Sequence, residues 1–225
     1  MSILTAGLSV AAYVLGSIPF GLLIGFARGV DVRKTGSGNI GATNVFRTVG
    51  TSWGGLTFLL DAVKGFVPAA LFPRVLSGLT GAESGAGHAL LFGCLAIVGH
   101  NWPVFLRFKG GKGIATSAGA LLGFAPLELG VGALTWLVLF LLTRYVSVAS
   151  IAAALAIPAA GWLHGGMEKP LLPGVLSGLG LVAVLRHRAN IRRLLNGTES
   201  RFKRTQREAP AADANAKPQE GPSTE

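Results

Sequence analysis

The run from residue 114 to residue 143, "IATSAGALLGFAPLELGVGALTWLVLFLLT", decides how many times this chain crosses a membrane. A crossing helix needs about 20 residues, so the run is too long for one crossing. Pro126 and Glu128 interrupt it near its middle. The sequence therefore predicts two short helices that meet at this point.

Further apolar runs of membrane-crossing length lie on both sides of it. They cover residues 3–26, 53–73, 87–106, 146–164 and 171–186. With the divided run they make seven helices, so we expect an all-α integral membrane protein with seven transmembrane helices. The first run lacks the basic start and small-residue cleavage site of a signal peptide, which predicts that it is retained.

The composition agrees with this class. Half of the residues are hydrophobic and 13% are charged, against about 25% charged in a soluble domain. The 33 glycines suit close helix packing in a membrane. The single cysteine, Cys94, excludes an intrachain disulfide and a cysteine metal cluster.

The basic residues predict the orientation. With seven crossings, one side of the membrane receives the loops 27–52, 107–113 and 144–147 and the C-terminal segment. That side carries Arg28, Arg33, Lys34, Arg47, Arg107, Lys109, Lys112, Arg144, Arg186, Arg188, Arg192 and Arg193. The other side carries little beyond Arg74 and Lys169. The positive-inside rule then places the N-terminus outside and the C-terminus in the cytoplasm. The formal charge of +10 comes mostly from loops between apolar runs, where membrane topology places basic residues. We therefore expect no nucleic-acid partner.

Composition also divides the chain into two parts. Residues 1–199 form the predicted seven-helix membrane domain. Residues 200–225 are polar and contain proline, and they predict a disordered cytoplasmic tail whose basic start lies on anionic lipid headgroups.

Three polar motifs fall on the predicted cytoplasmic face. The first, "DVRKTGSGNIGATNVFRTVG" (31–50), combines glycines that let backbone N–H groups converge on an anion with polar donors and one arginine. The second lies within "GHNWPVFLRFKGGKGIAT" (99–116), where glycines and lysines precede a helix. The third, "LRHRANIRRLLNGTE" (185–199), places His187, Asn190 and Arg192 or Arg193 at helical spacing, with Glu199 after a break.

Each motif alone is also typical of an ordinary juxtamembrane turn or of a solvated charged face. Together they predict a site for one or two phosphate-bearing substrates at the cytoplasmic interface. Asp61 and Lys64, three residues apart in an apolar run, predict either a functional pair or a mutually neutralised structural pair.

Four segments resemble a known family: "GSIPFG" (16–21), "GSGNIGATNVFRTVG" (36–50), "GHNWPVFLRFKGGKGIAT" (99–116) and "RHRANIRRLLNGTE" (186–199). In order and spacing they are similar to the bacterial acyl-phosphate:glycerol-3-phosphate acyltransferases, the PlsY family. The resemblance runs from about residue 10 to Glu199. Ala189 is a mild departure, since a charged or polar residue is common there.

The resemblance implies transfer of a fatty acyl group from acyl phosphate to the 1-hydroxyl of glycerol 3-phosphate. The products are lysophosphatidic acid and phosphate, and the reaction belongs to phospholipid biosynthesis. The implied catalytic residues are Ser37, Arg47, His187, Asn190 and Glu199. The implied substrate-binding residues are Asn39, Thr43, Asn44, Lys109, Gly110, Gly111, Lys112, Gly113 and Ser147.

The resemblance also implies the surroundings of the reaction. We expect no cofactor and no metal, a multi-pass location in the bacterial cytoplasmic membrane, and an active site that faces the cytoplasm. The expected partners are the two substrates, membrane lipids and the enzyme that makes acyl phosphate. No His is followed by Asp five positions later, so the catalytic signature of another large glycerolipid acyltransferase class is absent from the sequence. The alternative function is a small transporter for an organic phosphate.

Overall fold

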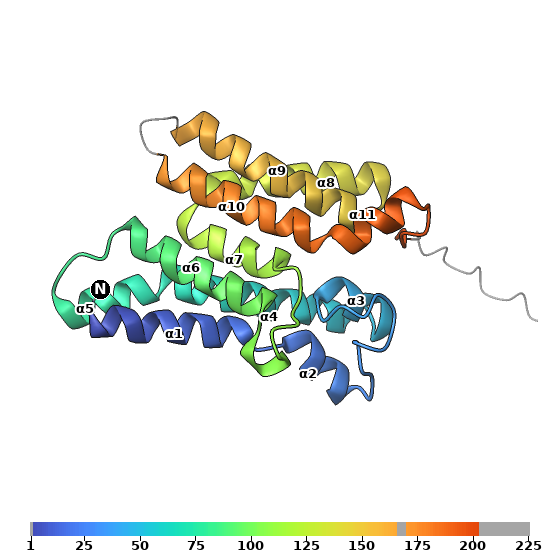
Figure 1. Ribbon diagram of the computed structural model, residues 1–225, viewed down its shortest axis with the longest axis horizontal. Coiled ribbons are helices and arrows are strands. Elements are labelled where there is room, and N and C mark those ends of the chain that lie inside the picture. Colours follow the sequence, from blue (N-terminus) through green and yellow to red (C-terminus); the bar gives the residue numbers. More distant parts are fainter. Residues whose placement is uncertain (1, 166–169, 203–225) are drawn as a thin grey trace, which may run out of the picture.

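The computed structural model describes residues 2–165 and 170–202, and every regular element in these ranges is a helix. The α-helices are α1 (Ile3–Ser17), α2 (Phe20–Ala27), α3 (Ala42–Thr48), α4 (Thr51–Ala70), α5 (Phe72–Thr80), α6 (Ala86–Asn101), α7 (Ile114–Phe124), α8 (Pro126–Thr143), α9 (Val146–Gly165), α10 (Leu171–Arg186) and α11 (Arg188–Leu195). A 3-10 turn, η1, covers Val104–Leu106. The long helices run lengthwise through the molecule (Figure 1).

Prolines divide the long apolar runs. The predicted division at Pro126 is confirmed, because α7 ends at Phe124 and α8 begins at Pro126. Proline suits the first position of a helix, where its missing N–H has no intrahelical partner. A second break, which the sequence analysis did not anticipate, separates α1 from α2 at Pro19.

Five helical segments are long and apolar enough to cross a membrane. They are Ile3–Ala27, Thr51–Thr80, Ala86–Leu106, Pro126–Thr143 and Val146–Gly165. The helices Ile114–Phe124 and Leu171–Arg186 are apolar but shorter. With 11 residues, α7 is only about 16 Å long. The all-helical membrane class is therefore supported, while the number of seven crossings and the orientation stay predictions.

The helices pack in two layers. In one layer α4 packs along α7, and α1 packs along α6; in the other, α9 packs between α8 and α10 (Figure 1). Glycines bring α4 and α7 close together. A Cβ atom on Gly65 would overlap the backbone of Thr116, and one on Gly119 would overlap the backbone of Ala62. Small residues at such contacts are the usual means of packing helices in a membrane.

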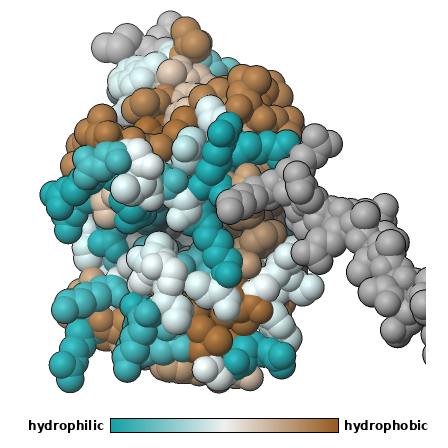
Figure 2. All heavy atoms as spheres, turned by 90° about the vertical axis from the view of Figure 1, so that its right-hand side faces the viewer, coloured by the Kyte–Doolittle hydropathy of each residue, from teal (hydrophilic) through white to brown (hydrophobic). Residues whose placement is uncertain are grey.

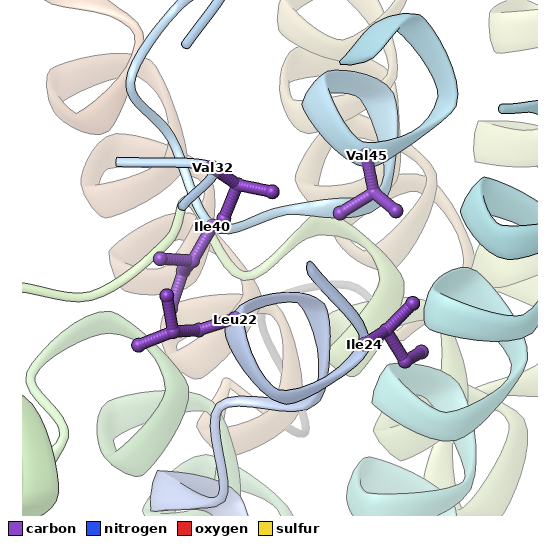
Figure 3. Close-up of a cluster of buried hydrophobic side chains, with 5 residues drawn as sticks. All are labelled: Leu22, Ile24, Val32, Ile40 and Val45. Atoms are coloured by element: carbon purple, nitrogen blue, oxygen red, sulfur yellow. The ribbon is translucent and has the colours of Figure 1, made fainter. Parts of the chain in front are cut away.

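The helices α2, α3 and α11 gather at one end of the molecule, on the right in Figure 1. Figure 2 looks onto this polar end and shows hydrophilic side chains over much of the face. A small apolar core supports it, formed by Leu22, Ile24, Val32, Ile40 and Val45 (Figure 3). Burying one aliphatic side chain contributes about 1.5–3 kcal/mol. This core therefore fixes the loop between α2 and α3, which carries the first polar motif.

Candidate functional site

The first motif is a loop organised around the buried side chain of Asn44. Asn44 Oδ1 accepts a hydrogen bond from the backbone N–H of Ser37 (2.8 Å), and its Nδ2 donates to the carbonyl oxygens of Val32 (2.8 Å) and Thr35 (3.1 Å). Asn39 Oδ1 accepts from the N–H of Gly41 (2.8 Å). The Asn44 amide is thus engaged with the loop backbone, and it fixes the backbone of Ser37, which lines the site.

The glycines of the second motif pack against the end of α6. A Cβ atom on Gly110 would overlap the carbonyl oxygen of His100, and one on Gly111 would overlap the His100 ring. Gly113 has a φ of +79°, a left-handed conformation that suits glycine. Arg186 holds the outer side of this loop. Its guanidinium donates to the carbonyl oxygens of Gly110 (2.8 Å) and Gly111 (2.9 and 2.5 Å).

The third motif forms a hydrogen-bonded cluster around the buried carboxylate of Glu199. Asn190 Nδ2 donates to Glu199 Oε1 (2.7 Å), and Arg193 Nε donates to Glu199 Oε2 (2.7 Å). Gly197, with a φ of +68°, lets the chain turn back after α11. Of the two arginines that helical spacing left open, Arg193 binds the carboxylate, whereas Arg192 is exposed.

The surroundings of this cluster change the proton affinities of its members. Burial opposes ionisation of Glu199, but hydrogen bonds from Asn190 and Arg193 outweigh it and lower the pKa of this carboxyl. Ser147 Oγ also lies near enough to lower that pKa, although it makes no hydrogen bond of good geometry. Burial, helped by the nearby charge of Lys112, lowers the pKa of His187 to about 4. Near neutral pH Glu199 is therefore charged and His187 is neutral.

The three motifs meet at one cavity of about 140 Å³. Eleven of the residues that the sequence pointed to line it: Ser37, Asn39, Thr43, Asn44, Arg47, Lys112, Gly113, Ser147, His187, Asn190 and Glu199. Lys109, Gly110 and Gly111 are not among the lining residues, and Lys109 is exposed. Those two glycines serve close packing of the loop against α6.

Three polar atoms in the lining lack a hydrogen-bond partner within the described protein. They are His100 Nδ1, Ser147 Oγ and Asn190 Oδ1, all buried. His100 Nδ1 faces the carboxylate of Asp61 at 3.7 Å. Buried polar groups are normally hydrogen-bonded, so Ser147 Oγ and Asn190 Oδ1 are placed to bind a ligand. Within residues 2–165 and 170–202, no group of three or more His, Cys, Asp and Glu side chains is arranged to hold a metal ion. The expectation of no metal and no cofactor stays a prediction.

Sequence reasoning did not assign Asp61 or His100 to the site, although both line the cavity. Asp61 Oδ1 pairs with Lys64 Nζ at 2.7 Å and lies 3.7 Å from His100 Nδ1, and all three side chains are buried. Lys64 Nζ also donates to the carbonyl oxygen of Ile18 (2.6 Å) and lies 5.5 Å from the centroid of the Phe20 ring. This contact gives the segment "GSIPFG" a role, since the break at Pro19 frees a carbonyl for Lys64.

A second cavity, of about 270 Å³ and almost wholly apolar, adjoins the first. Side chains of α7, α8, α9 and α10 line it, together with Phe58 of α4. Phe58, Ile114, Trp136 and Ser150 line both cavities. Trp136 Nε1 donates to Ser150 Oγ (3.1 Å), which fixes this shared wall. The molecule therefore places a polar, cationic site directly beside an apolar one between its two layers.

Comparison with protein families and known proteins gives one consistent result. The family model described as glycerol-3-phosphate acyltransferase matches residues 6–197. The glycerol-3-phosphate acyltransferase of Desulforudis audaxviator (strain MP104C) is 50% identical over 201 residues, 89% of this chain and 95% of the relative. The protein of the same name from Geobacter sulfurreducens is 46% identical and covers 87% of this chain and 96% of its own length.

Solved structures give the same answer. The crystal structure of PlsY, an integral membrane glycerol 3-phosphate acyltransferase, in its glycerol 3-phosphate form superimposes with a TM-score of 0.78 at 40% identity, over 88% of this chain and 96% of that one. Its lysophosphatidic acid form gives a TM-score of 0.75 at 40% identity, over 88% and 95% of the two chains. With the family model matched over most of its length, this chain belongs to the glycerol-3-phosphate acyltransferase family.

Proposed function

We propose that the protein transfers a fatty acyl group from acyl phosphate to the 1-hydroxyl of glycerol 3-phosphate, giving lysophosphatidic acid and phosphate. The observation that carries the proposal is the junction of the two cavities. The polar cavity, with Arg47 and Lys112 in its lining, suits phosphate groups, and the apolar cavity suits an acyl chain. The residues that line both, such as Trp136 and Ser150, are where a carbonyl carbon would lie.

The charges of the polar cavity favour anionic substrates. Arg47 and Lys112 line it, and Arg193 binds the charged carboxylate of Glu199. Asp61 is already paired with Lys64. The surplus of positive charge supports binding of a phosphate group on each substrate, because cationic donors form the strongest hydrogen bonds to phosphate.

We assign proton transfer to His187. The ring nitrogen Nδ1 lies 2.8 Å from the carbonyl oxygen of Ala183, to which it can only donate. In the neutral ring this leaves Nε2 as the proton acceptor. The glycerol oxygen attacks the acyl carbon, the carbon–oxygen bond to phosphate breaks, and the hydroxyl proton passes to Nε2. Phosphate is a good leaving group, so positioning and charge stabilisation are sufficient without a covalent enzyme intermediate.

Ser147 and Asn190 supply the remaining contacts of this proposal. Their unpartnered atoms, a hydroxyl and an amide oxygen, lie in the same cavity as His187. A glycerol hydroxyl satisfies both kinds of group, because it both donates and accepts hydrogen bonds. Glu199 then has a positioning role, since it fixes the Asn190 amide so that the oxygen faces the cavity.

The membrane arrangement is part of the proposal. We infer seven crossings with the N-terminus outside and the three motifs on the cytoplasmic side of the bacterial inner membrane. Arginines and lysines are concentrated in the segments that form the polar end, which supports this orientation. Acyl phosphate then reaches the site along the membrane, and the enzyme that makes it is the expected partner.

A prediction concerns the alkaline side of the pH profile. Burial lowers the pKa of Lys112 to about 8, and the nearby arginines act in the same direction. Lys112 therefore loses its charge as the pH rises through about 8, and we expect kcat/KM to fall there, since this quantity reports ionisations of the free enzyme. Protonation of His187, whose pKa is about 4, lowers kcat/KM only when the pH falls to about that value.

The Lys112→Arg variant checks this assignment, because arginine keeps its charge at every pH of the assay. We expect its kcat/KM to stay level above pH 8. Lys109→Arg is the matched control, since Lys109 is exposed and outside the cavity lining, and its profile should keep the alkaline fall. An alkaline fall that persists in Lys112→Arg would assign it to another group.

A second prediction concerns Arg186, which binds the carbonyl oxygens of Gly110 and Gly111. Each hydrogen bond from a charged group contributes about 1.5–3 kcal/mol. We expect Arg186→Gln to raise the KM for a phosphate-bearing substrate about 10- to 100-fold, because the loop that carries Lys112 loses its support. Arg188→Gln, which changes an exposed arginine two residues away, should leave KM unchanged. Equal KM values in the two variants would show that the loop keeps its shape without the hydrogen bonds from Arg186.

The decisive experiment mixes purified protein with acyl phosphate and glycerol 3-phosphate and follows both lysophosphatidic acid and released phosphate. Stoichiometric formation of both products, without acyl-CoA or ATP, supports the proposal. Product formed with acyl-CoA but not with acyl phosphate would show that the protein is an acyltransferase with a different acyl donor. Absence of product with either donor, together with uptake of glycerol 3-phosphate into proteoliposomes, would favour the transporter.

A further inference from the structure

Residues Ser200–Phe202, here called the strap, join the two layers of the molecule at its polar end. The strap follows Glu199 directly and contacts both layers. The backbone N–H of Phe202 donates to the carbonyl oxygen of Arg144 (3.0 Å) in the turn between α8 and α9. Arg201 Nε donates to the carbonyl oxygen of Thr143 (3.0 Å), the last residue of α8.

On its other side the strap holds Arg47 of α3. Arg47 Nη2 donates to the carbonyl oxygen of Ser200 (3.0 Å). The guanidinium carbon of Arg47 lies 5.2 Å from the centroid of the Phe202 ring, within the range of a cation–π interaction. Arg47 is one of the cations that line the polar cavity, so two contacts from the strap set where its charge lies.

The Phe202 ring also belongs to a row of aromatic side chains that reaches the wall between the cavities. Its centroid lies 5.2 Å from that of Phe46 and 5.7 Å from that of Phe140. Phe140 in turn stacks on Trp136, with centroids 4.9 Å apart. Trp136 lines both cavities. The Phe202 ring thus contacts both α3, which packs on α4, and α8, which belongs to the other layer.

We propose that Phe202 is a positioning residue, which holds the Arg47 guanidinium at the anion site and keeps the two layers in register around it. The inference rests on the proposed function, since its effect is expected on the binding of glycerol 3-phosphate. Without the ring, Arg47 loses its cation–π partner and the strap loses its packing against Phe46 and Phe140. The guanidinium then samples other rotamers, and the anion is bound less often in the productive geometry.

The test compares Phe202→Ala, Phe202→Leu and Phe202→Tyr with the wild type in steady-state assays on full-length protein. We expect Phe202→Ala to raise the KM for glycerol 3-phosphate about tenfold, with kcat changed less than threefold. Phe202→Tyr keeps the aromatic face and should retain the wild-type KM. Phe202→Leu keeps most of the volume without the ring, so its KM should lie between those of the other two variants.

One control variant and the separate measurement of KM and kcat distinguish positioning from loss of folding. Phe105→Ala removes an exposed phenylalanine that makes no aromatic pair among the described residues, and it should leave both constants unchanged. A purely structural defect lowers the amount of active enzyme, and therefore apparent kcat, at constant KM. An unchanged KM in Phe202→Ala, or a wild-type KM in Phe202→Leu, would overturn the inference. An inactive wild-type protein would instead overturn the proposed function.

Discussion

Glu199→Ala is expected to lower kcat/KM by about 10²- to 10³-fold, one of the two largest effects of a substitution in this protein. Glu199 is the charged carboxylate that faces the cations of the polar cavity, and it binds both Asn190 and Arg193 at 2.7 Å. Each hydrogen bond to this charged carboxylate contributes about 1.5–3 kcal/mol, and the substitution removes both. Here the loss also releases the Asn190 amide from its fixed orientation.

The measurement is kcat/KM on detergent-purified variants with equal thermal stability checked in parallel. Glu199→Gln separates charge from geometry, because its amide oxygen still accepts from Asn190 but no longer neutralises Arg193. We expect an intermediate loss for this variant. Glu83→Ala removes an exposed carboxylate between α5 and α6, outside the cavity lining, and serves as the control. Activity of Glu199→Ala within threefold of the wild type would show that the cluster does not position substrate.

The buried pair of Asp61 and Lys64 gives the second large effect, this time on folding. Both side chains are almost fully buried, and Lys64 Nζ joins α4 to the break between α1 and α2 through the carbonyl oxygen of Ile18. Lys64→Met or Asp61→Leu alone leaves one buried charge without its partner. We expect each single variant to lose about 3–5 kcal/mol of unfolding free energy.

The double variant Asp61→Leu/Lys64→Met removes both charges, and it should unfold at a higher temperature than either single variant. This non-additivity is the signature of a direct pair. It also decides between the two readings that the sequence left open. Recovered activity with recovered stability assigns the pair a structural role. A stable but inactive double variant would instead give Asp61, which lines the polar cavity, a part in the reaction.

Much of the fold could be predicted because it depends on local features of the sequence. Apolar runs of sufficient length mark the helices, and Pro126 divides the longest run where the structure divides it. Pro19 was a weaker signal, because it stands inside an apolar run of the right length for one crossing. The structure breaks the helix there, and the freed carbonyl of Ile18 is compensated by a charge from a distant helix.

The site could be predicted in part. Motifs on separate segments pointed to the same phosphate chemistry, and the residues of all three motifs line one cavity. What the sequence could not supply was the partner of each side chain. Gly111 reads as a residue that lets a backbone approach a phosphate, yet the atoms close to it are those of the His100 ring. Asn44 reads as a ligand donor, yet its amide holds the loop.

Long-range contacts account for the remaining differences. Arg186 reads as one of several basic residues that end a transmembrane helix, and only the folded chain brings it to the carbonyl oxygens of Gly110 and Gly111. The predicted tail begins at residue 200, and Ser200, Arg201 and Phe202 pack against both layers. The rest of that predicted tail, residues 203–225, lies outside the described part of the chain.

The shortness of α7 has a consequence for how two unlike substrates meet. This helix is about 16 Å long, roughly half the thickness of the hydrocarbon core of a bilayer, and it begins inward of the end where α3 and α11 lie (Figure 1). In the proposed membrane arrangement, the loop before it, with Lys112, lies below the headgroup plane, in a depression that is open to water at the polar end and to lipid chains at its side. The two proposed substrates, a water-soluble phosphate ester and a fatty acyl chain, would then meet at one depth, each still in its own solvent.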